Sequence, residues 1–133
     1  MINPKLVLCN FLSDSRELKS LAFDYGFSGV DWSFNLASLP DSPAAEAEWT
    51  QALAFLAPLE VRYHCPFYRL DLGHDNPEEA GKAAEVFQRI IDLVSLVQGR
   101  FLTVHIGLGH DSTEPLSWDM TIDRKSTRLN SSH

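Results

Sequence analysis

Two histidines stand where strand-forming runs of the sequence end, and they are the clearest indication of chemistry in the chain. His64 follows an alternating run that begins at Glu60, and His105 lies near the end of an apolar run that begins at Phe101. Imidazole nitrogens bind divalent metal ions and transfer protons near neutral pH. On parallel neighbouring strands, about 4.8 Å apart, both rings can reach one ion or one substrate. The alternative is that each ring bonds only to the backbone or to a carboxylate.

The elements that must position these histidines are four predicted strands, each followed by a helical pattern. The strands are predicted at residues 5–11, 29–34, 60–66 and 101–106. The fourth run is almost wholly apolar, which is typical of a strand covered on both faces. Residues 112–122 resemble the start of one more helix.

Alternation along the strands predicts which face each side chain occupies. His64 falls on the same face as Arg62, and His105 on the same face as Thr103. Both imidazoles are therefore predicted to point away from the helices. Cys65 falls on the opposite face from His64, which argues against a cysteine-histidine nucleophile at this position.

Capping residues mark where the predicted helices begin. Asp14, Ser42 and Asn76 can each accept a hydrogen bond from a first turn, and Pro43 and Pro77 suit first helical positions. Apolar residues at helical spacing then predict a buried face for each helix. These residues are Leu18, Leu21, Ala22 and Tyr25; Trp49, Ala52, Leu53 and Leu56; and Ala80, Ala83, Ala84, Phe87, Ile90, Ile91, Val94 and Val97.

The alternation of strand and helix predicts an α/β fold with a parallel sheet. Such units either close into a (β/α)8 barrel or spread into an open doubly wound sheet. The open sheet usually has a glycine-rich turn after its first strand, whereas residues 10–14 contain no glycine. We therefore predict a truncated (β/α)8 TIM barrel. A complete barrel needs roughly 250 residues, and residues 1–122 supply its first four βα units.

The last eleven residues, 123–133, differ from the rest in having three cations, one acid and no periodicity. Their sequence is the in-frame translation of a common short-read sequencing adapter. We therefore expect a tail that is not native and exclude it from the fold; the alternative is a frayed basic tail. Without it, eight basic and seventeen acidic residues remain, and the net charge changes from -7 to -9.

Composition and charge exclude several classes of protein. The chain is 44% hydrophobic and 22% charged and has two cysteines, Cys9 and Cys65, which we expect to remain thiols. These values exclude a disordered protein, a collagen and a disulfide scaffold. There is no apolar run of the roughly 18 residues that cross a bilayer, so we expect no membrane partner and a cytoplasmic location. The negative charge also disfavours nucleic acid as a partner.

Four short motifs, taken in order, resemble those of one barrel superfamily. They are residues 26–31 (Gly-Phe-Ser-Gly-Val-Asp), 63–67 (Tyr-His-Cys-Pro-Phe), 76–78 (Asn-Pro-Glu) and 103–107 (Thr-Val-His-Ile-Gly). Their order and spacing resemble strands two to four of the xylose isomerase-like TIM barrel superfamily. That group includes sugar and sugar-phosphate isomerases and epimerases, and the endonuclease IV type of repair enzyme. The resemblance covers most of residues 1–110.

The resemblance implies a divalent metal ion, Mn, Mg, Co or Zn, in the complete protein. His64 and His105 would be metal ligands, as in the endonuclease-like branch, or substrate contacts, as is more usual in the isomerases. Trp32 and Phe67 are candidate walls of a sugar pocket, although aromatic residues more commonly fill cores. The acid/base carboxylates of the isomerases come from strands five to eight, so we expect no catalytic residue here. Phe34 departs from the acidic residue that often ends strand two.

Three functions remain open on the sequence. The first is a fragment, itself inactive, of a metal-dependent sugar or sugar-phosphate isomerase or epimerase in carbohydrate metabolism. The second is an endonuclease IV-like phosphodiesterase, which the net charge of residues 1–122 disfavours. The third is a non-enzymatic α/β binding domain that is monodisperse and unfolds cooperatively. A half-barrel would instead expose strand edges and form oligomers or aggregates.

Overall fold

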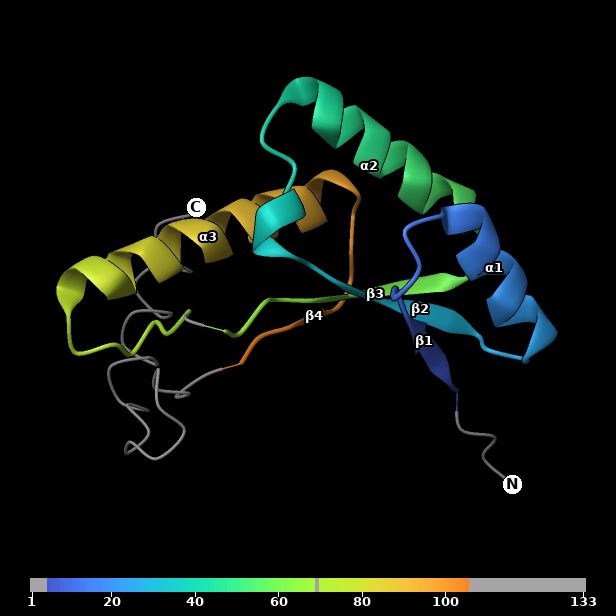
Figure 1. Cartoon of the computed structure of the whole chain (residues 1–133), viewed down its shortest axis with the longest axis horizontal. Coiled ribbons are helices and arrows are strands. Elements are labelled where there is room, and N and C mark those ends of the chain that lie inside the picture. Colours follow the sequence, from blue (N-terminus) through green and yellow to red (C-terminus); the bar gives the residue numbers. More distant parts are fainter. Residues whose placement is uncertain (1–4, 69, 106–133) are drawn as a thin grey trace. The chain divides into compact units, whose positions relative to one another are not determined.

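A computed structural model describes residues 5–68 and 70–105. Within these ranges, strands alternate with helices and form a four-stranded parallel sheet (Figure 1). The strands are β1 (Val7–Cys9), β2 (Gly29–Ser33), β3 (Glu60–His64) and β4 (Leu102–Thr103). The helices are α1 (Ser15–Asp24), α2 (Pro43–Phe55) and α3 (Pro77–Leu96), and a short 3-10 helix, η1 (Leu36–Ser38), precedes α2. The predicted α/β class is confirmed.

The four strands lie side by side in chain order, β1-β2-β3-β4, and each neighbouring pair is parallel. One helix of the series α1, α2, α3 lies in each connection. The register pairs Val30 with Val61 and Asp31 with Arg62. Because paired residues of a parallel sheet point to the same side, these two rows occupy opposite faces.

The chain divides into two compact units. The first contains residues up to 64 together with 93–103, and therefore all four strands, α1 and α2. The second contains residues 65–92 and 104 onward, and therefore most of α3. His64 belongs to the first unit and His105 to the second.

Helices α1 and α2 cover one face of the sheet in the first unit. Val30 of β2 and Leu18 of α1 are both completely buried. Beside them, the Phe34 ring lies 5.8 Å from the Trp49 ring and 6.1 Å from the Tyr63 ring, measured between centroids. Trp49 comes from α2 and Tyr63 from β3, so this aromatic cluster joins the helix to the sheet. The helix-covered face is therefore the one that carries Val30 and Tyr63.

The predicted helix starts are confirmed. The side chains of Asp14, Ser42 and Asn76 each accept a hydrogen bond from a backbone N–H in the first turn of α1, α2 and α3 respectively. Pro43 and Pro77 are the first helical residues of α2 and α3. These caps satisfy backbone donors that a helix leaves without an internal partner.

Two residues of the predicted buried stripes are exposed instead. Tyr25 is 72% exposed because it follows the last residue of α1, where the chain leaves the helical geometry that defined the stripe. Ile91 is 42% exposed, whereas Leu93 is 1% exposed. Ile90, Leu93 and Val94 form the buried face at this part of α3, and Ile91 lies beside it.

The outer strands are shorter than predicted. β1 covers only Val7–Cys9 and β4 only Leu102–Thr103. Phe101 and Thr103 are exposed, so the prediction that the fourth strand is covered on both faces is wrong for these residues. The reason is the register: Leu102 pairs with Tyr63 and Thr103 with His64, so Phe101 and Thr103 lie on the face away from the helices. Residue 106, at the end of the predicted strand, lies outside the described ranges.

Lys19 of α1 ties the two helices of the first unit together. Its Nζ donates hydrogen bonds to the carbonyl oxygens of Phe55, at 2.9 Å, and Ala57, at 2.6 Å. These carbonyls lie at the carboxyl end of α2, where a positive charge is favourable. We expect Lys19→Met to lower the free energy of unfolding by about 1 kcal/mol, measured by urea denaturation. Lys82→Met, which removes only exposed ion pairs on α3, should leave it unchanged; equal effects would contradict the role of Lys19.

Candidate functional site

His64 is the last residue of β3 and lies at the carboxyl edge of the sheet. The register places it between Ser33 of β2 and Thr103 of β4. Its side chain is 27% exposed, and Nδ1 lies 3.2 Å from Oδ2 of Asp31, whose side chain is 23% exposed. An imidazole and a carboxylate thus meet, partly shielded from water, on the face away from the helices. That pairing is suited to proton transfer or to holding an imidazole for a ligand.

Asp31 is the partner that the sequence analysis did not single out. It lies in the middle of β2, between Val30 and Trp32. Aspartate is uncommon inside strands, so an acidic residue at this position was a usable signal. Its alternation with Val30 placed it on the same face as His64, but the cross-strand register needed to pair the two residues is not visible in the sequence.

Asn10, the residue after β1, fixes the end of β2. Its Oδ1 accepts a hydrogen bond from the Ser33 backbone N–H at 2.7 Å, and its Nδ2 donates to the Ser33 carbonyl at 3.2 Å. The backbone N–H of Asn10 also donates to the Asp31 carbonyl at 3.3 Å. One side-chain amide and one backbone amide therefore hold the segment that carries Asp31.

Charged residues continue along the same face toward the amino end of β3. Glu60 accepts a hydrogen bond from Nε of Arg62 at 3.0 Å and lies 3.9 Å from Nζ of Lys5. The Arg62 guanidinium also stacks on the Phe101 ring, 5.2 Å from its centroid. Exposed ion pairs of this kind contribute little to stability. Their effect is that a polar row, ending in His64, runs along this face of β3.

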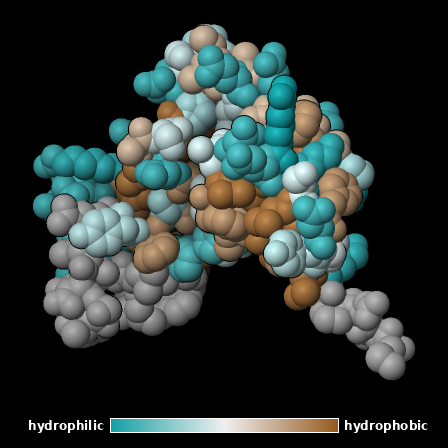
Figure 2. Space-filling model, turned by 45° about the vertical axis from the view of Figure 1, so that its right-hand side comes forward, coloured by the Kyte–Doolittle hydropathy of each residue, from teal (hydrophilic) through white to brown (hydrophobic). Residues whose placement is uncertain are grey.

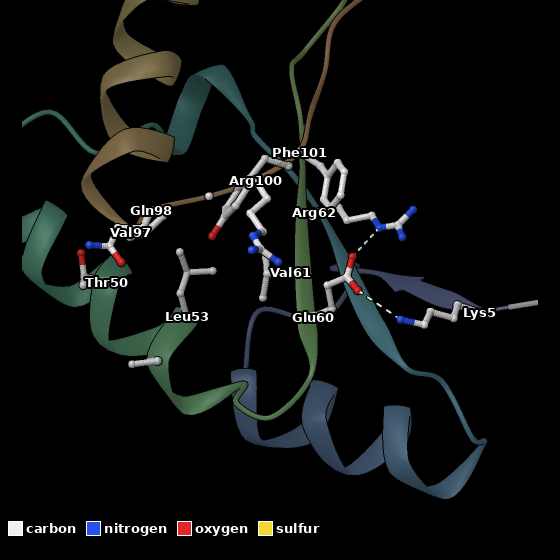
Figure 3. A pocket seen from close by; sticks show the side chains of 13 residues that line it. Lys5, Thr50, Leu53, Glu60, Val61, Arg62, Val97, Gln98, Arg100 and Phe101 are labelled. Carbon is white, nitrogen blue, oxygen red and sulfur yellow. Dashed lines mark hydrogen bonds and ion pairs between the residues drawn. The ribbon is translucent and has the colours of Figure 1, made fainter.

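A cavity of about 660 Å³ opens beside β3, away from His64. Figure 3 shows Arg100 and Leu53 on one side of β3 and the ion-paired Lys5, Glu60 and Arg62 on the other. The cavity wall also includes Thr50 and Gln98, among other residues. Its wall includes neither Asp31 nor His64, so it is separate from that pair.

Tyr63, which also borders this cavity, is 4% exposed, and burial raises the pKa of its phenol above 10.0. In the unfolded chain the phenol ionises near its ordinary pKa, so the folded state binds the proton more tightly. The contribution of the neutral Tyr63 phenol to stability is therefore fully present below pH 10.0. It is lost as the pH rises through the raised pKa. We expect Tyr63→Phe to reduce this alkaline loss in urea unfolding. An identical pH dependence in wild type and Tyr63→Phe would refute the assignment.

Trp32 and His105 are the other predicted substrate and metal residues. Trp32 pairs in register with Tyr63, so alternation places it on the helix-covered face, opposite His64. His105 lies in the second unit, where its ring contacts Phe67 with 4.9 Å between centroids. A site shared by His64 and His105 therefore stays a prediction.

In residues 5–68 and 70–105, no three or more His, Cys, Asp or Glu side chains are grouped so that they could hold a metal ion. The Cys9 and Cys65 side chains form no disulfide, as expected from the sequence. Residues 106 and 107 of the motif 103–107, residues 112–122 and the tail at 123–133 fall outside the described ranges, as do the predictions made for them.

Comparison with known proteins gives no assignment. No family model matches the sequence, and no curated protein matches it. Among the helices of the described part of the chain, none combines the length and apolar character needed to cross a membrane. The fold and the contact between Asp31 and His64 are therefore the basis for a proposed function.

Proposed function

We propose that residues 1–122 are the amino-terminal half of a (β/α)8 barrel from a metal-dependent sugar or sugar-phosphate isomerase or epimerase. The strand order supports a barrel, because consecutive parallel strands with one helix in each connection are how barrels are built. A doubly wound sheet reverses its strand order at a switch point, and β1 to β4 contain no reversal. The resemblance of residues 26–31, 63–67 and 103–107 supports this particular superfamily.

The observation that carries the functional part is the contact between His64 and Asp31. In a barrel, the face away from the helices becomes the interior, and the carboxyl ends of the strands hold the active site. His64 occupies that end of β3, and its ring is held by a carboxylate on the neighbouring strand. The site would therefore present one oriented imidazole to a substrate or an ion.

The donor atoms fit a divalent ion only in part. A neutral imidazole nitrogen is a suitable ligand for Zn, Co or Mn. A carboxylate can orient such a ligand by accepting a hydrogen bond from the other ring nitrogen. The described residues hold fewer than three grouped ligands, so the other ligands and the acid/base carboxylates belong to later strands in this proposal. When bound, the ion would polarise a sugar carbonyl and hydroxyl. The chain's own contribution is to orient the imidazole of His64.

Exposed apolar side chains are consistent with a piece of a larger structure. Leu6, Phe11 and Phe101 are 57%, 64% and 52% exposed. Figure 2 shows apolar residues gathered on the displayed face of the molecule. Such surface normally meets another part of the protein or a partner, and β1 and β4 each have an unpaired edge in the described sheet.

The proposal is tested on the source gene and its product. Genomic DNA downstream of codon 122 should encode four further βα units that carry acidic residues at strand ends. The full product should interconvert sugars or sugar phosphates, and a chelator should abolish this activity. Salt-dependent binding and cleavage of abasic duplex DNA would favour the endonuclease IV-like alternative. A gene that ends near codon 122 and yields a monodisperse, cooperatively unfolding protein would favour a binding domain.

A further inference from the structure

We propose that Asp31 is a positioning residue that holds His64 in the tautomer with its proton on Nδ1, so that Nε2 carries the lone pair. The inference rests on the proposed function only in assigning Nε2 to contact an ion or a sugar hydroxyl. The tautomer itself follows from contacts within the first unit, and it can be measured without substrate or metal.

The chemistry of the contact determines the proton's position. A carboxylate only accepts hydrogen bonds, whereas each nitrogen of a neutral imidazole either donates or accepts. Nδ1 of His64 lies 3.2 Å from Oδ2 of Asp31, so Nδ1 must carry the hydrogen. In the neutral ring, Nε2 is then the basic nitrogen. A histidine fixed in this way by a carboxylate is the form that binds metal ions or accepts a proton.

Hydrogen bonds to the neighbouring strands hold the backbone segments that carry Asp31 and His64. Asn10 holds β2 through the Asp31 carbonyl and both backbone groups of Ser33. On the other side, the Phe34 backbone N–H donates to the His64 carbonyl at 2.9 Å. Because Asp31 and His64 stand on strands joined at these points, their separation does not depend on a loop. A site held on strands is better positioned than one on loops.

The same chain contains a histidine in the opposite tautomer. Nδ1 of His74 accepts a hydrogen bond from the Asn76 backbone N–H at 2.9 Å. The proton of the neutral His74 ring must therefore be on Nε2. His64 and His74 thus provide opposite expectations within one sample. Their nitrogen chemical shifts can be compared directly in one NMR spectrum, so an error in chemical-shift referencing does not affect the comparison.

The experiment is a long-range proton–nitrogen correlation spectrum of the full chain with labelled histidine, recorded where the imidazoles are neutral. His64→Gln and His74→Gln identify the two sets of signals. We expect a protonated Nδ1 for His64 and a protonated Nε2 for His74. A His64 ring protonated on Nε2 would overturn the proposal, as would an even mixture of tautomers.

A substitution at Asp31 tests whether its carboxylate, rather than the other surroundings of the ring, determines the tautomer of His64. Asp31→Leu keeps a similar branched shape but removes the acceptor, so the excess of the Nδ1-protonated form should fall by about tenfold or more. The control Asp24→Leu removes an exposed carboxylate at the end of α1 and should not change the His64 signals. An unchanged His64 tautomer in folded Asp31→Leu would also contradict the proposal. If Asp31→Leu does not fold, the wild-type spectrum still decides the question.

The outcome is distinguishable from failure of the proposed function. A gene product without isomerase activity but with His64 protonated on Nδ1 would retain Asp31 as the positioning residue and reject only the assigned reaction. An active isomerase with His64 protonated on Nε2 would retain the reaction and reject the role of Asp31.

Discussion

Gly29→Ala should lower the free energy of unfolding by about 3 kcal/mol, because the added methyl group has no room beside β3. A Cβ built at Gly29 collides with the carbonyl oxygen of Glu60, and its next contacts, at 3.3 Å, are the Glu60 carbonyl carbon and Cβ. Backbone atoms cannot rotate away as a side chain can, so β2 and β3 must separate. Urea denaturation with a circular dichroism signal measures the loss.

Gly81 of α3 is the matched control for this substitution. A Cβ at Gly81 meets nothing within 4 Å, and the residue is exposed in the interior of a helix. Gly81→Ala should therefore stabilise the protein by about 0.5–1 kcal/mol through helix propensity. Equal destabilisation by the two substitutions, or a neutral Gly29→Ala, would show that β2 and β3 are not packed as described.

Tyr63→Ala should have the largest effect of any substitution considered, about 3–5 kcal/mol. The Tyr63 ring is stacked with Phe34 and lies 6.3 Å from Trp49 between centroids. It also fills the space beside Gly99, where an added Cβ would lie 2.7 Å from the ring. Removing the ring leaves a cavity where α2 meets the sheet, and the transition in urea should move to much lower concentration.

The control for this prediction is the same substitution at an exposed position. Tyr25 is 72% exposed at the end of α1, so Tyr25→Ala should change stability by no more than about 0.5 kcal/mol. If Tyr63→Ala is as mild as Tyr25→Ala, the aromatic cluster is not the core that joins α2 to the sheet.

Local signals in the sequence predicted the elements well and their outer limits poorly. The caps at Asp14, Ser42 and Asn76 act between neighbours in the chain, so residue type and spacing determined them. The extent of β4 depends instead on what lies beside it. An apolar run from 101 to 106 predicted a covered strand, but Phe101 lies on the face of the sheet away from the helices and is exposed. Tertiary context of this kind is not encoded in the run itself.

The candidate site was predictable to the extent that it depends on alternation along one strand. Alternation correctly grouped His64 with Arg62 on the face away from the helices. The contact with Asp31 depends on the register between β2 and β3, and the support from Asn10 depends on a side chain that reaches from the end of β1. Relations between strands of this kind involve residues more than twenty positions apart. Periodicity within one element does not contain them.

We propose that the carboxyl edge of this sheet, with His64 held by Asp31, belongs to the active site of a sugar isomerase or epimerase. The most direct test is kcat/KM for metal-dependent sugar interconversion by the complete gene product, compared with its His64→Gln variant. We expect a fall of about 100-fold or more in His64→Gln, and wild-type activity in the control Asp24→Leu. Sugar turnover that survives His64→Gln unchanged, or its absence from the folded, metal-loaded wild type, would contradict the account.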